Sequence, residues 1–123
     1  MERKRYRELI VWQKAMELAK LVYQVTKQFP DDERFGLTSQ IRRAAVSVPS
    51  NIAEGQGRLT QGEFKQFLGH ARGSVFEVET QAELANEFGF LAEQRAEKVI
   101  ELTSSITTAE RPYQFNLNIS QST

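Results

Sequence analysis

The 123-residue sequence contains no cysteine, and histidine and tryptophan occur only once each. The lack of cysteine excludes a disulfide, a thiolate nucleophile and a cysteine metal ligand. A di-iron helical bundle needs a glutamate three residues before its histidine, and Phe67 stands at that place before His70. No recognisable Ser or Cys nucleophile accompanies His70 either. We therefore expect no catalytic activity, no metal site and no cofactor.

Long hydrophobic runs are also missing. No stretch approaches the roughly 20 apolar residues of a membrane-spanning helix, and the charged start MERKRYREL is followed by no signal-like apolar run. We expect a protein of the cytoplasm that does not enter the membrane. The chain is 40% hydrophobic, which is enough for one domain with a single core.

What the sequence does contain is helical periodicity. Apolar residues recur at steps of three and four, which is typical of amphipathic helices. Thr60 and Glu63 form a capping box that predicts a helix start, and Gly89 is a typical helix stop. Four helical segments with short connections between them indicate an all-α fold. We expect an antiparallel up-down four-helix bundle over residues 1–110. The helices are expected at about residues 9–28, 33–56, 60–88 and 91–109.

Two prolines modify this scheme. Pro49 lies inside the apolar stripe of the second helix, where proline removes a backbone hydrogen bond and costs roughly 3 kcal/mol. Nearby Ser and Asn side chains can satisfy the freed group, so we expect a helix kinked at Pro49. Pro112 is expected to end the fourth helix. Apolar and polar residues alternate after it, which predicts an extended tail over residues 111–123, either ordered as a strand or disordered.

Three blocks of the chain carry a family resemblance. They read YRELIVWQKAMELAKLVY, FGLTSQIRRAAVSVPSNIAEGQGR and EFKQFLGHARGSVFEVETQ, and together they cover most of residues 6–91. The chain resembles the four-helix-bundle proteins encoded within intervening sequences of 23S ribosomal RNA genes. Relatives of these proteins include the accessory protein of diversity-generating retroelements. The resemblance implies an all-α bundle that assembles as a ring-like homopentamer and has no known catalytic activity. It also implies that some relatives act on nucleic acid or on a nucleic-acid enzyme.

Charge is unevenly distributed in the neutral chain. Residues 1–72 hold 13 Lys or Arg and 8 Asp or Glu, whereas residues 73–123 hold 3 and 8. Cations close to one another bind phosphates without reading sequence. The candidate nucleic-acid-binding residues are Arg3, Lys4, Arg5, Arg7, Arg58 and Lys65.

A second polar set lies on the middle helices. Arginine binds carboxylates with two parallel hydrogen bonds, so one hypothesis is a structural polar network between helices or subunits. Its members are Arg42, Arg43, Asn51, Glu54, Arg72 and Glu79. Phosphate contacts by these arginines, or plain solvated charge, are the alternatives.

Small residues favour self-association. Ala44, Ala45, Gly69 and Gly73 let helices approach closely, and the first helix has more apolar face than one neighbour can cover. The leading hypothesis is a non-catalytic oligomeric accessory or scaffold protein that binds RNA, DNA or a ribonucleoprotein. The alternative is a structural self-assembling bundle that binds a protein partner and no nucleic acid.

Overall fold

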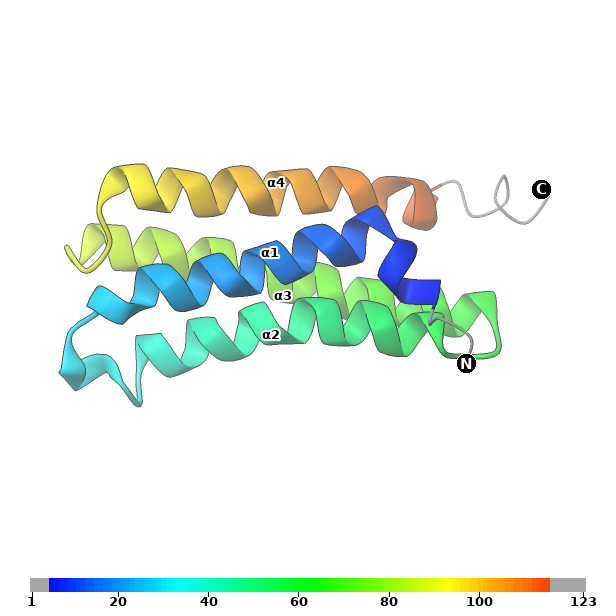
Figure 1. The fold of residues 1–123 in the computed structure, drawn as a ribbon, viewed down its shortest axis with the longest axis horizontal. Coiled ribbons are helices and arrows are strands. Elements are labelled where there is room, and N and C mark those ends of the chain that lie inside the picture. The colour runs from blue at the N-terminus through cyan, green and yellow to red at the C-terminus, as the bar shows by residue number, and fades with distance from the viewer. Residues whose placement is uncertain (1–4, 116–123) are drawn as a thin grey trace.

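The computed structural model describes residues 5–115, with side chains described for residues 5–113. Its long helices are α1 (Ile10–Val25), α2 (Leu37–Gln56), α3 (Gln61–Glu87) and α4 (Glu93–Phe115) (Figure 1). Three short 3-10 helices accompany them: η1 (Arg5–Glu8), η2 (Thr26–Gln28) and η3 (Asp31–Glu33). No strand occurs in this part of the chain, so the predicted all-α class is confirmed.

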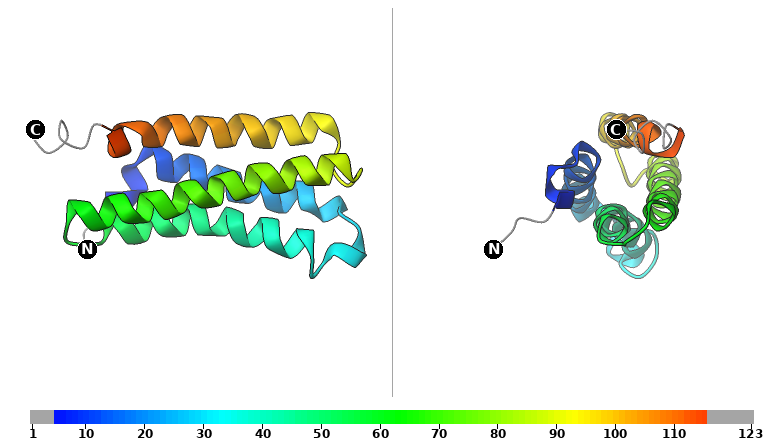
Figure 2. Two further views of the ribbon diagram at one scale, coloured as in Figure 1. Left: turned by 180° about the vertical axis from the view of Figure 1, so that it is seen from behind. Right: turned by 90° about the vertical axis from the view of Figure 1, so that its right-hand side faces the viewer.

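The four long helices form an antiparallel bundle in which each helix lies beside the next along the chain. The end view shows that α1 also lies beside α4, which closes the bundle (Figure 2). The up-down four-helix bundle expected from the sequence is therefore confirmed. No helix within residues 5–115 is long and apolar enough to cross a membrane.

The core follows the periodicity of the sequence. On α1 the buried stripe consists of Val11, Ala15, Leu18, Val22 and Val25, with Phe29 just beyond the helix. The second apolar stripe of α1 is less covered: Trp12 is half-buried, and Tyr23 is 44% exposed. The described residues therefore cover this part of the apolar face of α1 only in part.

Local signals set the helix ends. The Thr60 hydroxyl accepts a hydrogen bond of 3.1 Å from the Glu63 amide, which confirms the capping box. Gly89 has a φ of +84° just after α3, as a glycine stop requires. Glu33 does not start the second helix as expected. Instead its Oε1 accepts a hydrogen bond of 2.9 Å from the Leu37 amide and caps α2 from the preceding turn.

The prediction that α4 ends before Pro112 was wrong, because the helix continues through Pro112 to Phe115. Proline removes only one helical hydrogen bond here, close to the end. Tyr113 then packs against the core, and its ring meets Phe64 edge-on at 5.8 Å. This tertiary contact favours helix over residues 111–115, where an extended tail was expected. The remainder of that tail, residues 116–123, lies outside the described part of the chain.

Pro49 is buried within α2, which is continuous through it. Side chains of the same helix donate to neighbouring carbonyls: Ser50 to Val46 at 2.9 Å, and Asn51 to Ser47 at 2.8 Å. The carbonyl that loses its helical donor belongs to Ala45, next to Val46. The kink at Pro49 stays a prediction.

Candidate nucleic-acid interface and surface grooves

Three elements that carry basic residues lie at the same end of the bundle. Arg5 and Arg7 lie in η1, Arg58 in the turn between α2 and α3, and Lys65 near the start of α3 (Figure 1). We call these four residues the basic end. Arg3 and Lys4, predicted to belong to the same cluster, lie outside the described residues. Four of the six candidate phosphate-binding residues thus lie on elements at the same end of the bundle.

The guanidinium groups of Arg7 and Arg58 lie close to aromatic rings. The Arg7 guanidinium lies 5.7 Å from the Tyr6 ring centre and 5.8 Å from that of Trp12. Arg58 lies 4.8 Å from the Phe67 ring centre and forms a salt bridge of 2.8 Å with Glu54. Stacking of this kind orients a guanidinium, and the edge of the Arg58 guanidinium already donates to Glu54. Arg5 and Lys65 are exposed.

Four of the six residues of the predicted polar network make hydrogen bonds to partners outside that set. Arg42 binds Thr26, Glu54 binds Arg58, and Asn51 binds a backbone carbonyl of its own helix. The Glu79 carboxylate accepts a hydrogen bond of 2.8 Å from Thr103 on α4. Arg72 lies near Glu110, and Arg43 lines a hollow on the surface. A network that joins two subunits stays a prediction.

Sequence reasoning missed Glu110, a charged residue type that lies fully buried on α4 beside Val99, Thr103 and Ile106. Its side chain is 0% exposed, and neither carboxylate oxygen has a hydrogen-bond partner in the described structure. Burial raises the pKa of Glu110 from 4.5 to about 7, and the nearby Arg72 cation partly offsets this rise. The signal was present, because Glu110 continues the inward-facing spacing of Ala96, Val99, Thr103 and Ile106.

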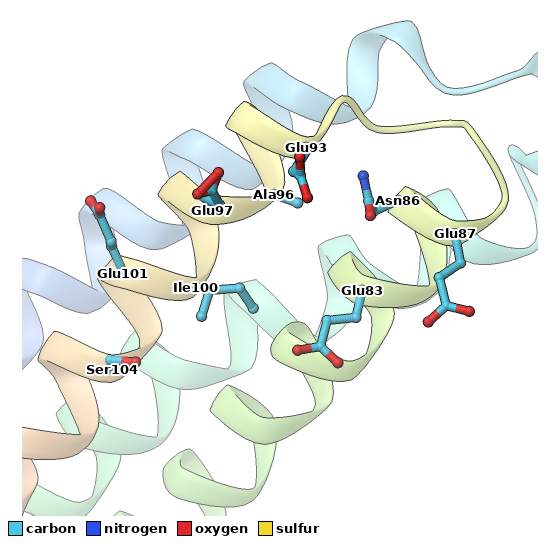
Figure 3. A pocket seen from close by; sticks show the side chains of 9 residues that line it. All are labelled: Glu83, Asn86, Glu87, Glu93, Ala96, Glu97, Ile100, Glu101 and Ser104. Atoms are coloured by element: carbon cyan, nitrogen blue, oxygen red, sulfur yellow. The ribbon is translucent and has the colours of Figure 1, made fainter.

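An acidic groove of about 630 Å³ lies between α3 and α4, at the end of the bundle opposite the basic end. Glu83 and Glu87 come from α3, Ile100 lies between the two helices, and three further glutamates come from α4: Glu93, Glu97 and Glu101 (Figure 3). The groove contains no His or nucleophilic Cys, and residues 5–113 hold no group of three side chains suited to a metal ion. Its negative charge suits contact with a cation.

Two hollows of about 660 and 540 Å³ share Glu77 and follow the outer side of α2 and α3. We call them together the α2/α3 groove. Gly69 and Gly73 line it one helical turn apart, and a Cβ atom built on either would meet nothing within 4 Å. His70, exposed beside them, contacts the edge of the Phe67 ring. The backbone of a second protein chain could therefore approach α3 closely at these two glycines.

The comparisons with known proteins agree with this architecture. The family model described as "23S rRNA-intervening sequence protein" matches residues 7–109. A crystal structure from Bacteroides thetaiotaomicron, described as a protein with unknown function from the S23 ribosomal protein family, has a similar fold with a TM-score of 0.78. The two chains are 20% identical, and the match covers 85% of this chain and 99% of the other. Comparison with curated proteins gives no match.

Proposed function

The chain belongs to the 23S rRNA-intervening sequence protein family, and on that premise we propose that it is a non-catalytic, self-associating accessory protein. It binds RNA, DNA or a ribonucleoprotein through its basic end. Because family membership fixes no biochemical activity, the proposal depends on the surfaces of this chain.

The placement of Arg5, Arg7, Arg58 and Lys65 on elements at the same end of the bundle is the observation that carries the proposal. These residues come from three different elements, so their shared end is a property of the fold rather than of one charged stretch. Each phosphate that a cation neutralises releases counterions, which gives affinity without sequence readout. One chain offers few such contacts, and several copies in one assembly would multiply them through avidity.

Self-association through the α2/α3 groove completes the proposal. A glycine inside a helix costs about 1 kcal/mol relative to alanine, and no contact with a described residue explains Gly69 or Gly73. Two large apolar side chains line this surface: Phe35, which is 85% exposed, and the half-buried Phe67. A helix of a second copy would cover these side chains. A ring of five copies is the arrangement that we favour from the family resemblance.

Fluorescence anisotropy with a structured RNA and a DNA duplex, titrated with salt, tests the nucleic-acid part of the proposal. Changing Arg5, Arg7, Arg58 and Lys65 to Ala should weaken binding and flatten the salt dependence. The slope of log K against log salt should change by about 0.9 for each lost duplex phosphate contact. The matched control changes Lys20, Lys27, Arg95 and Lys98 to Ala, which removes the same charge from exposed positions elsewhere. An equal loss in both variants would contradict a specific role of the basic end.

The acidic groove favours a second candidate, a self-assembling scaffold that binds a protein partner and no nucleic acid. Five glutamates around Ala96 and Ile100 offer negative charge beside an apolar floor, which suits a basic amphipathic segment. Nucleic acid would be repelled from this end of the bundle. Failure to bind RNA and DNA even at low salt, where phosphate contacts are strongest, would favour this candidate.

A further inference from the structure

The last turns of α4 hold a carboxyl group in an unusual setting. Glu110 is 0% exposed, and its oxygens make no hydrogen bond to any described residue, Arg72 included. Burying an ionised carboxylate without hydrogen bonds costs several kcal/mol, because the lost hydration is not replaced. The buried position therefore favours the neutral, protonated form of the side chain.

A second carboxyl in the same interface shows the contrast. Glu79 on α3 receives a hydrogen bond from Thr103 on α4, with 2.8 Å between Oγ1 and Oε2. The pair Arg72 and Glu110 lies two helical turns from the pair Glu79 and Thr103. On each helix the two residues are seven positions apart. The interface thus satisfies one carboxylate and leaves the other without a donor.

The charged groups around Glu110 do not replace its lost hydration. α4 packs against α3 and α1. From α3, Arg72 exerts an attractive field on the carboxylate. From α1, whose first turns lie beside the end of α4, the charged residues are the half-buried Lys14 and the exposed Glu17. Arg111, the neighbour on α4 itself, is exposed.

The helix beyond Glu110 depends on tertiary contacts. Pro112 cannot donate the helical hydrogen bond and disfavours helix at Arg111. Tyr113 holds this end by its contacts with the core and with the Phe64 ring. The end of α4 is therefore a segment with weak local helix preference, fixed by an apolar contact and by a carboxyl that must stay uncharged.

We propose that Glu110 is a proton-dependent latch, which keeps the end of α4 docked on α3 when neutral and releases it toward water when ionised. Opening returns the carboxylate to water, where it loses its proton in the ordinary acidic range. The proton is thus bound more tightly in the docked state. Acid stabilises the docked end of α4, and neutral pH loosens it. This device does not depend on the nucleic-acid or self-association proposals.

Hydrogen–deuterium exchange of the full chain at pH 4.5 to 8 tests the latch. Protection factors, which remove the intrinsic pH dependence of exchange, are followed for residues 104–115 and, as internal reference, for α2. Protection of the α4 end should fall by up to about tenfold per pH unit between about 4.5 and 7, and should level off above 7, where both states are ionised. The α2 reference should change little over the same range.

Two variants complete the test. Glu110→Gln keeps the shape and removes the ionisation, so protection of residues 104–115 should no longer depend on pH. Glu101→Gln, at an exposed position of the same helix, should keep the wild-type profile. A flat wild-type profile would overturn the latch, and this outcome does not depend on whether Glu110→Gln folds. A Glu110→Gln variant that kept the wild-type slope would overturn it as well.

Discussion

Arg42 on α2 donates a hydrogen bond of 2.8 Å from Nε to the Oγ1 atom of Thr26, just past the end of α1. The Thr26 hydroxyl in turn donates to the Val22 carbonyl at 2.7 Å, so its acceptor and donor capacities are both used. The Arg42 guanidinium also lies 4.5 Å from the centre of the Tyr23 ring. One side chain thus fastens α2 to α1 at the end of the bundle opposite the basic end.

Changing Thr26 to Val should destabilise the fold. Thr26 is 2% exposed, so the isosteric substitution would leave the Arg42 Nε without its acceptor in a partly buried site. We expect the free energy of unfolding to fall by about 1–3 kcal/mol, measured by urea denaturation. Thr38→Val is the matched control, because the buried Thr38 hydroxyl has no hydrogen-bond partner among the described residues. There the change should be neutral or stabilising, and equal losses at both positions would contradict the role of the Arg42 contact.

Gly55 should not tolerate a larger side chain. It is buried in α2 where α3 approaches closely, and an added Cβ would lie 2.7 Å from the Phe67 Cβ and 3.1 Å from the Phe64 Cδ1. Gly55→Ala should therefore lower the free energy of unfolding by about 1–3 kcal/mol through overpacking, despite the better helix propensity of alanine. Gly62→Ala, where an added Cβ meets nothing within 4 Å, serves as the control in the same urea experiment. A stabilised Gly55→Ala protein would show that α2 and α3 can separate without cost.

Changing Gly73 to Ala should stabilise the single chain and weaken its self-association. Because space around it is open within the chain, Gly73→Ala should raise the intrinsic stability of α3 by about 0.5–1 kcal/mol. If a second copy covers the α2/α3 groove, the same methyl group should push that copy away and lower the assembled mass in sedimentation velocity. Gly62→Ala again provides a matched change at an open glycine outside the groove. An assembled mass that is unaltered in Gly73→Ala would exclude this glycine from the interface.

The sequence predicted the helices where local signals act alone. The capping box at Thr60, the glycine stop at Gly89 and the buried stripe of α1 all depend on residues near one another in the chain. The same local reasoning failed at Pro112, because it could not weigh the contact between Tyr113 and Phe64, which lie far apart in sequence. Tertiary packing outweighed the unfavourable local preference there.

Polar partners were harder to predict than helices. The sequence placed Arg42 in a network with carboxylates, and its hydrogen-bond acceptor is Thr26, 16 residues away on the neighbouring element. The partner of a side chain depends on how far each helix is rotated about its axis, and spacing along one chain does not give that rotation. The shared end of the basic residues needs no such rotation, because short connections in an up-down bundle bring these helix ends to the same end; phosphate binding there stays a prediction.

Glu110 gives the fold a pH dependence of definite sign. Its pKa is about 7 in the folded chain, raised chiefly by burial, against an ordinary value of 4.5. Between these values the folded state binds more protons than the unfolded state. The contribution of Glu110 to stability is therefore fully present below about pH 4.5 and is lost as the pH rises to about 7, by up to about 1.4 kcal/mol per pH unit.

Glu110→Met should remove this dependence and stabilise the protein most at neutral pH. Methionine fills a similar volume and has no charge to bury, and replacing buried ionic groups by apolar ones is neutral or stabilising by about 1–4 kcal/mol. In urea denaturation at pH 4.5, 6 and 8, the difference between variant and wild type should grow in favour of the variant up to pH 7. Glu101→Met, at an exposed position of α4, controls for the change of residue type and should show a constant difference. A Glu110→Met protein that loses stability most at pH 8 would mean that the ionised carboxylate is favourably bound where it lies, through the field of Arg72.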